Sequence, residues 1–195
     1  MRIDERVRDG VIKSLPEAKE IKNKELRERV YDAWAISLAE SGYKRIEDMP
    51  CKGVWDVPPL KSGTQADHLR GVARLSAAIV KELKDTFEEF DVDMDEVIAG
   101  GLCHDLGKPF EFNPDNLARW KADPRKTGLP ATRHSVYGLH IALSAGLPEN
   151  IAHITVNHSK EGEFVKRSLA CEIVRHADHT WWEILRSAGL QQEQE

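Results

Sequence analysis

The spacing of the apolar residues constrains this chain most, because it is helical almost everywhere. Apolar side chains recur at steps of three and four, and strand patterns are almost absent. Residues 66–86 carry the clearest stripe, in which His68 falls on the same face as Val72, Leu75 and Ile79. The sequence therefore predicts an all-α fold, and it predicts that His68 faces the core.

Further helices are predicted from the same period and from residues that begin or end helices. They cover residues 17–41, 97–106, 116–122, 133–145, 148–157 and 168–188. Thr132 and Ser168 are the predicted N-caps of the helices that follow them. Residues 47–65 and 110–130 are broken by prolines and glycines, so we interpret them as irregular segments. Long ordered loops often carry function, and these two are expected to form pocket walls.

Length and charge bound the organisation and the partners of the chain. Its 195 residues suit one main domain at residues 51–195, preceded by a helical extension at residues 1–50. The net charge of -5 argues against a nucleic-acid polymer as partner. No apolar run is long enough to span a membrane, so no membrane partner is expected. The sequence leaves open whether the chain forms a homo-oligomer.

The cysteines and the N-terminus indicate a cellular location. Cys51, Cys103 and Cys171 lie far apart and form no CxxC pair, so we interpret them as reduced thiols. The first residues are charged and lack the apolar core of a signal peptide. We therefore expect a cytoplasmic protein.

Residues 100–108 read Gly-Gly-Leu-Cys-His-Asp-Leu-Gly-Lys and place His104 directly before Asp105. Neighbours on a helix point about 100° apart, so both side chains can reach one point between them. An imidazole beside a carboxylate suits a divalent metal, and the two carboxylate oxygens can serve two ions. Gly107 is the predicted C-cap of this helix. The alternative is a helix-end histidine that is hydrogen-bonded to a nearby aspartate.

Other polar residues fall on core faces or at the starts of predicted helices. Asp178 lies within an apolar stripe, where a carboxylate is costly unless it is paired or bound to a metal. His158 shares a face with apolar residues, and His134 falls in the first turn of its helix. With His68, His104 and Asp105 they make six residues of metal-ligand type. One metal would leave two or three of the six without a partner, whereas two metals sharing Asp105 would use all of them.

Helix geometry excludes three further histidines from the predicted metal ligands. His153 lies five residues from His158, about 140° away around the helix axis, and is expected off the core face. His176 and His179 fall on the side of their helix that carries glutamates. We interpret these two as solvent-facing partners of the glutamates.

The order His…His-Asp…His…His…Asp resembles that of the HD-domain superfamily of metal-dependent phosphohydrolases, in its two-metal form. The segments that carry the resemblance are DHLRGVARLSAAIV, GGLCHDLGK, RHSVYGLHIALSAGLPENIAHITVNHS and IVRHADHTWW. Together they span roughly residues 66 to 185. The resemblance implies an all-α HD-domain helical bundle, to which residues 1–50 would add an N-terminal helical extension.

The resemblance also implies a role for each matched residue. One divalent transition metal would be held by four side chains, namely His68, His104, Asp105 and Asp178. Asp105 would bridge to a second such metal, held by His134 and His158. The expected cofactors are therefore two divalent ions from the series Fe, Mn, Co, Ni and Zn.

Lys108 matches a lysine that follows the His-Asp pair in many members of the superfamily, where it contacts an anionic substrate. A lysine close to two cations needs an anion to relieve the repulsion. The alternative is a lysine that satisfies the C-terminal end of a helix. Arg133, Gln65 and Trp55 are further candidates for contact with a small anionic substrate.

The expected activity is that of a phosphohydrolase, which cleaves a small phosphate ester or a nucleotide with a metal-activated water. Asp105 or Asp178 would accept a proton from the water, and Lys108 would stabilise charge on the phosphate oxygens. Two alternatives stay open: a di-iron oxygenase similar to inositol oxygenase or to the phosphonate-cleaving oxygenase, and a catalytically silent sensing module. The segment after His158 lacks the Gly-Tyr-Pro pattern of the cyclic-dinucleotide-hydrolysing branch, so that branch is not expected.

Overall fold

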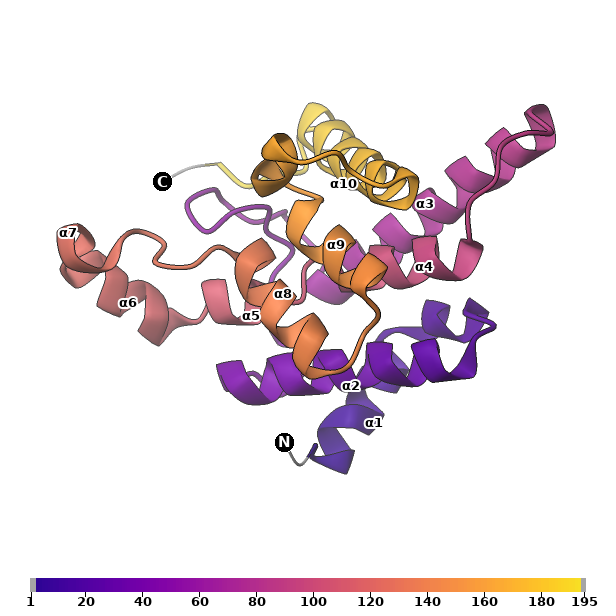
Figure 1. Ribbon diagram of the computed structural model, residues 1–195. Helices are drawn as coiled ribbons and strands as arrows, with labels where there is room; N and C mark the ends of the chain where they lie inside the picture. The colour runs from indigo at the N-terminus through magenta and orange to yellow at the C-terminus, as the bar shows by residue number, and fades with distance from the viewer. Residues whose placement is uncertain (1–2, 194–195) are drawn as a thin grey trace.

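Helices build the described part of the protein, residues 3–193 of a computed structural model, and no strand occurs there. Figure 1 shows the long helices α3 (Gln65–Thr86) and α10 (Leu169–Ser187) on the opposite side of the molecule from α2 (Lys24–Ser41). The other elements are α1 (Glu5–Ser14), η1 (Pro16–Glu20), η2 (Ile46–Asp48), α4 (Met94–Cys103), α5 (Lys108–Glu111), α6 (Pro114–Ala122), α7 (Pro124–Thr127), α8 (His134–Ser144), α9 (Glu149–Asn157) and η3 (Lys160–Phe164), where η marks a 3-10 helix. The predicted all-α fold is confirmed.

Four of the predicted helices, now α3, α8, α9 and α10, agree with the structure to within one residue at each end. Ser168 caps α10 as predicted, because its Oγ accepts the backbone N–H of Cys171 at 3.2 Å. The predicted cap Thr132 is wrong. The residue that precedes α8 is Arg133, and its side chain makes no capping hydrogen bond.

The prediction of one helix over residues 17–41 is also wrong. The chain forms η1, leaves helical geometry at Ile21, and begins α2 after Asn23. The side chain of Asn23 accepts the N–H of Leu26, and the Asp95 carboxylate accepts the backbone N–H groups of Lys22 and Asn23. These side-chain acceptors offer the backbone an alternative to a continuous helix.

Residues 110–130 contain α6, which begins two residues before the helix predicted over residues 116–122, and a second short helix, α7, which was not predicted. Each of these helices begins at a proline, Pro114 or Pro124. Proline is tolerated in the first turn of a helix, where its missing N–H would have no partner in any case. The prolines that the sequence pattern interprets as breaks are therefore helix starts.

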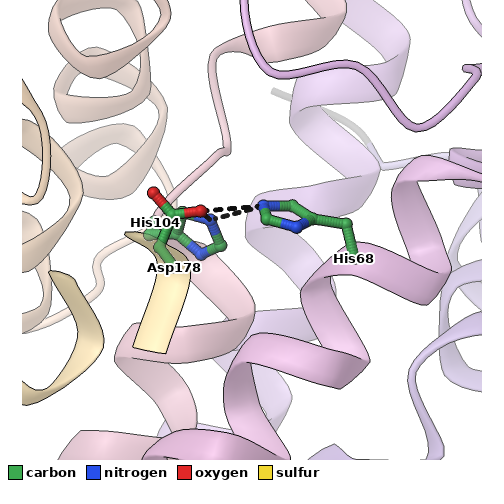
Figure 2. A group of neighbouring side chains, drawn as sticks. All are labelled: His68, His104 and Asp178. Carbon is green, nitrogen blue, oxygen red and sulfur yellow. Dashed lines mark hydrogen bonds and ion pairs between the residues drawn. The ribbon is translucent and has the colours of Figure 1, made fainter. Parts of the chain in front are cut away.

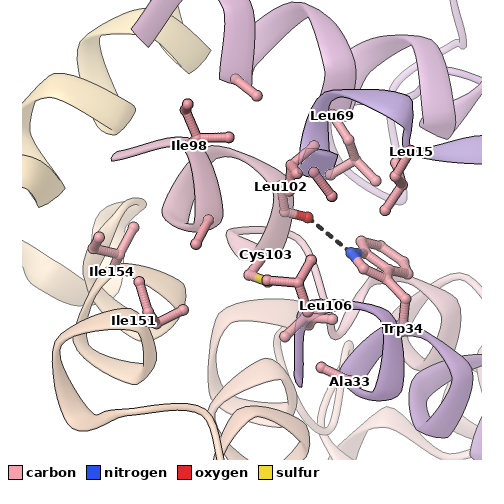
Figure 3. Close-up of a cluster of buried hydrophobic side chains, with 14 of the residues drawn as sticks. Leu15, Ala33, Trp34, Leu69, Ile98, Leu102, Cys103, Leu106, Ile151 and Ile154 are labelled. Carbon is pink, nitrogen blue, oxygen red and sulfur yellow. Dashed lines mark hydrogen bonds between the residues drawn. The ribbon is translucent and has the colours of Figure 1, made fainter. Parts of the chain in front are cut away.

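The core gathers around α4, which packs against α2, α3, α9 and α10. Figure 3 shows Trp34 of α2 beside this helix, with its Nε1 donating to the carbonyl oxygen of Leu102 at 2.8 Å. Ser37 Oγ donates to the carbonyl oxygen of Leu106 at 2.5 Å. These donors satisfy one carbonyl group in the last turn of α4 and one in the turn that follows it. Residues 11–49 thus contribute to one hydrophobic core with the rest of the described chain, and the domain boundary placed after residue 50 stays a prediction.

A glycine allows α3 and α4 to approach closely. A Cβ on Gly101 would lie 2.8 Å from the Cα of Ala73, a distance that real Cβ atoms essentially never show. No side chain therefore fits between the two backbones at this point. The close packing brings His68 of α3 beside the end of α4.

Two predictions concern the chain as a whole. Cys51, Cys103 and Cys171 are free and buried, and burial raises the pKa of the Cys51 thiol to about 11. Within residues 3–193, no helix is long and apolar enough to cross a bilayer. The cytoplasmic location stays a prediction.

Candidate metal centre

The centre is built where α4 ends. This helix ends at Cys103, earlier than predicted, and Gly107 does not cap it, since its φ of -89° is not left-handed and it precedes α5 instead. A Cβ on Gly107 would lie 2.0 Å from the carbonyl oxygen of His134, so the backbones of α5 and α8 are in direct contact there. The turn places His104 and Asp105 in the core and sets α5 against α8.

All six residues that the sequence singles out as metal ligands meet in one buried cluster. They come from α3, the end of α4, the start of α8, the end of α9 and α10. Five of them are at most 3% exposed, and the side chain of Asp178 is 13% exposed. Figure 2 shows His68, His104 and Asp178 pointing toward one another. Residues that are far apart in the sequence thus converge on one place.

Four ligand atoms form what we call the four-donor group: His68 Nε2, His104 Nε2, Asp105 Oδ2 and Asp178 Oδ1. His68 Nε2 lies 3.1 Å from His104 Nε2 and 3.2 Å from Asp105 Oδ2. It also lies 3.3 Å from Asp178 Oδ1. His104 Nε2 is 3.2 Å from Asp105 Oδ2 and 3.9 Å from Asp178 Oδ1.

The other oxygen of Asp105 faces a second set of atoms. This three-donor group consists of Asp105 Oδ1, His134 Nε2 and His158 Nε2. Asp105 Oδ1 lies 3.4 Å from His134 Nε2 and 3.7 Å from His158 Nε2. The two imidazole nitrogens are 3.4 Å apart. One carboxylate therefore stands between two groups and offers one oxygen to each.

These distances fit metal coordination. Ligand atoms bound about 2.1 Å from one ion lie about 3.0 Å apart at right angles and about 3.4 Å apart in a tetrahedron. Two overlapping triplets, His68–His104–Asp178 and His104–Asp105–His158, each bring their ligand atoms within 4.8 Å of one another. Asp178 Oδ1 is buried without a hydrogen-bond partner, which is costly unless a cation takes that place. The residues present thus suit divalent ions.

Hydrogen bonds on the far side of three imidazoles fix their orientation. His104 Nδ1 lies 2.8 Å from the carbonyl oxygen of Gly101, and His158 Nδ1 lies 2.9 Å from that of Thr155. His134 Nδ1 lies 2.6 Å from Glu111 Oε2. Each acceptor requires the proton on Nδ1, so in the neutral imidazole Nε2 carries a lone pair that points into the cluster. Lone pairs that face one another repel unless a cation lies between them.

Both carboxylates of the cluster are held in the charged form. Burial opposes ionisation of Asp105, but His104 and Lys108 keep its pKa well below the usual range. Burial also opposes ionisation of Asp178, but the imidazoles of His68 and His104 beside it lower its pKa. Ionised carboxylates are the form that binds a cation.

The pKa values of His158 and His104 shift in opposite directions. Burial lowers the pKa of His158 to about 3, and the neighbouring His104 and His134 act in the same direction, so His158 is neutral. Burial alone would lower the pKa of His104, but the charge of Asp105 outweighs it and the net shift is upward. A proton on His104 and a bound metal ion would therefore compete, because the negative charges of Asp105 and Asp178 stabilise both.

Two further side chains contact the carboxylate that both groups share. Lys108 is 2% exposed, and its Nζ lies 2.9 Å from Asp105 Oδ2 while donating to the carbonyl oxygen of Lys52 at 2.9 Å. Gln65 is completely buried, and its Nε2 donates to the same oxygen of Asp105 at 2.8 Å. Lys108 lines the cavity described below, whereas Gln65 does not belong to its lining. Both side chains help to hold Asp105 in place.

Sequence reasoning misses one buried carboxylate, that of Glu111. It is completely buried, and its Oε2 accepts hydrogen bonds from the ring and the backbone N–H of His134. Its Oε1 pairs with Arg133, which also pairs with Glu161 at 3.2 Å. Glu111 sits in a four-residue helix, where periodicity gives no signal. A charged residue among apolar neighbours, in Pro109–Phe112, is the only hint that the sequence offers.

A cavity of about 750 Å³ opens onto the cluster. Its lining includes Lys108 and four of the six candidate ligands, namely Asp105, His134, His158 and Asp178. Trp55 and Trp182 also line it, so residues 47–65 do contribute a wall as predicted. Arg133 and Pro130, the last residue of the predicted irregular segment 110–130, line it as well. The size suits a small molecule.

The histidines set aside on geometric grounds lie outside the cluster. His153 bonds with the side chain of Asn157 and accepts the backbone N–H of Ser168, so it joins α9 to the start of α10. His176 is exposed and lies 3.9 Å from Glu172, as predicted. His179 is exposed as well, but it lines the cavity.

Comparison with protein families gives a single finding. The model of the HD domain matches residues 66–181, which is more than half of the chain and contains all six ligand candidates. No curated protein and no solved structure gives a match.

Proposed function

This chain belongs to the HD-domain family, and from that premise we propose that it is a phosphohydrolase that cleaves a small phosphate ester or nucleotide with the help of two divalent transition-metal ions. One observation carries the proposal. The two oxygens of Asp105 face two separate groups of donor atoms, which supports a bridging carboxylate between two ions. A single ion would leave the imidazoles of one group facing each other with nothing between them.

The residues around the cluster have distinct tasks in this proposal. Bound ions would lower the pKa of a shared water and neutralise charge on the phosphate. Asp178 can accept a proton from that water with the oxygen that is not among the four donor atoms, and Asp105 is the other candidate. Lys108 lines the cavity and would stabilise charge on a phosphate oxygen.

Two other candidates for substrate contact differ in their surroundings. Arg133 lines the cavity, but Glu111 and Glu161 already pair with it, which leaves little free charge for an anion. Gln65 is buried and does not belong to the lining of the cavity, so we propose that it orients the bridging carboxylate rather than contacting the substrate directly. Trp55 lines the cavity and stays a candidate for contact with the part of the substrate beyond the phosphate.

The test is metal analysis of the purified protein, followed by a screen of phosphate esters and small polyols. We expect two ions per chain and phosphate release with manganese, cobalt or nickel. Oxygen consumption by an iron-loaded protein on addition of a polyol or phosphonate, without phosphate release from esters, would favour the di-iron oxygenase instead. A protein that is purified without metal and is insensitive to chelator would point to the silent sensing module.

A further inference from the structure

The buried carboxylate of Glu111 has a place that packing alone does not explain. A completely buried carboxylate strongly destabilises the folded state unless charges and hydrogen bonds compensate it. Here both oxygens are engaged, one by Arg133 and the other by the Nδ1 and the backbone N–H of His134. Gly107 brings α5 into backbone contact with α8, and this contact holds Glu111 against His134.

The four imidazoles of the cluster differ in what they meet on their outer side. His104 and His158 each meet a backbone carbonyl oxygen, at 2.8 and 2.9 Å. His68 Nδ1 is buried without a partner. His134 alone among these four meets a carboxylate, at 2.6 Å. A carboxylate fixes the imidazole more firmly than a carbonyl does, and it makes the opposite nitrogen a stronger donor to a metal.

The carboxylate lies on the side of the cluster that has fewer ligands. His134 belongs to the three-donor group, whereas the four-donor group has one more protein atom. Glu111 thus strengthens a ligand where the count of ligands is lowest. Its negative charge also adds to the attraction for a cation there.

We propose that Glu111 is a positioning residue that controls occupancy of the three-donor group without affecting the four-donor group. It acts through His134 and does not touch the metal itself. The inference rests on the two-ion site of the proposed function. It predicts that loss of the Glu111 carboxylate weakens one metal-binding step and leaves the other unchanged.

The test is stepwise titration of the metal-free protein with Co²⁺ or Mn²⁺, followed by calorimetry and by elemental analysis after gel filtration. Glu111→Gln keeps the reach of the side chain and removes its charge, whereas Glu111→Asp keeps the charge and shortens the reach. In both variants we expect the weaker binding step to lose about 10- to 100-fold in affinity. The tighter step should change by less than about twofold, because its ligands do not contact Glu111.

Glu161→Gln is the matched control. It removes the other carboxylate that pairs with Arg133, but it leaves the contact between Glu111 and His134 intact. Both of its binding steps should resemble those of the unaltered protein. Thermal unfolding in excess chelator checks the fold of every variant without any contribution from metal.

The outcomes distinguish a failure of the proposed two-ion site from a failure of the role proposed for Glu111. If the unaltered protein binds a single ion, the two-ion site itself is wrong, and the inference about Glu111 falls with it. If the unaltered protein binds two ions and both Glu111 variants bind them equally well, only the role of Glu111 is overturned. Equal weakening of both steps, or the same loss in Glu161→Gln, would also overturn it, because a general loss of structure would then explain the effect.

Discussion

The two donor groups share Asp105 but are supported in different ways. The four-donor group takes His68 and Asp178 from the long helices α3 and α10, whose faces pack in the core. The three-donor group depends on helix ends, because His134 begins α8 and His158 follows the last residue of α9. More ligands on longer helices should give tighter binding. We therefore expect the four-donor group to fill first and to contribute more to the stability of the fold.

Asp105→Ala should have the largest effect, because it removes an oxygen from both groups at once. We expect the variant to bind neither ion under conditions that saturate the unaltered protein and to show no detectable phosphate release. Elemental analysis and the ester assay measure the two effects. Full metal content in this variant would contradict both the bridging role and the proposed function.

Replacing one candidate ligand of each group should affect the two metal-binding steps separately. Asp178→Ala should weaken the tighter step, and His158→Ala the weaker step, each by more than the roughly 10- to 100-fold that is typical of an outer-shell partner. Titration with Co²⁺ resolves the two steps. If the two variants lost the same step, the division into two groups would be wrong.

Metal removal tests the coupling of the centre to the fold. An ion present at 100 times its dissociation constant stabilises the native state by about 2.7 kcal/mol. For a chain of this size that corresponds to a fall in melting temperature of roughly 5–10 °C on addition of chelator. His158→Ala should keep most of this shift and Asp178→Ala should lose most of it, because α3, α4 and α10 meet at the four-donor group. A melting temperature that chelator leaves unchanged would count against a buried site.

Three of the six ligand candidates can be recognised from the sequence because each is a polar residue on an apolar helix face. His68 and Asp178 are polar residues on apolar stripes, and five residues of helical rotation suffice to place His158 on the core face and His153 off it. Those helices have clear periods, so the faces are defined before any tertiary contact is known. The fold class follows from the same periods.

The support of the ligands could not be predicted, because it depends on contacts between short elements. Glu111 lies in a helix of four residues, and its partner His134 is 23 positions away in the sequence. Gly107 has the appearance of a helix C-cap, yet its lack of a side chain is needed for contact with α8. Neither fact has a local signature. The orientation of the candidate ligands therefore depends in part on short segments, for which helical periodicity predicts nothing.

The smallest effect expected lies at the turn that joins the two groups. Ser37 Oγ donates to the carbonyl oxygen of Leu106, directly after Asp105 and before Gly107. Ser37→Ala leaves that buried carbonyl without this donor, and we expect a loss of about 1–3 kcal/mol in the free energy of unfolding. The matched control is Ser41→Ala in the same helix, since the Oγ of Ser41 bonds only to carbonyl oxygens of α2 itself. Chemical denaturation measures both.

The comparison of these serine variants also tests how the turn serves each donor group. Leu106 leads into α5, which carries Glu111 toward His134, whereas His68 and Asp178 are held by helices that Ser37 does not contact. A loosened turn should therefore weaken the second binding step by a few-fold and leave the first unchanged, and Ser41→Ala should alter neither step. If Ser37→Ala weakened the first step instead, the end of α4 would support the four-donor group more than the three-donor group, and the proposed order of filling would have to be reversed.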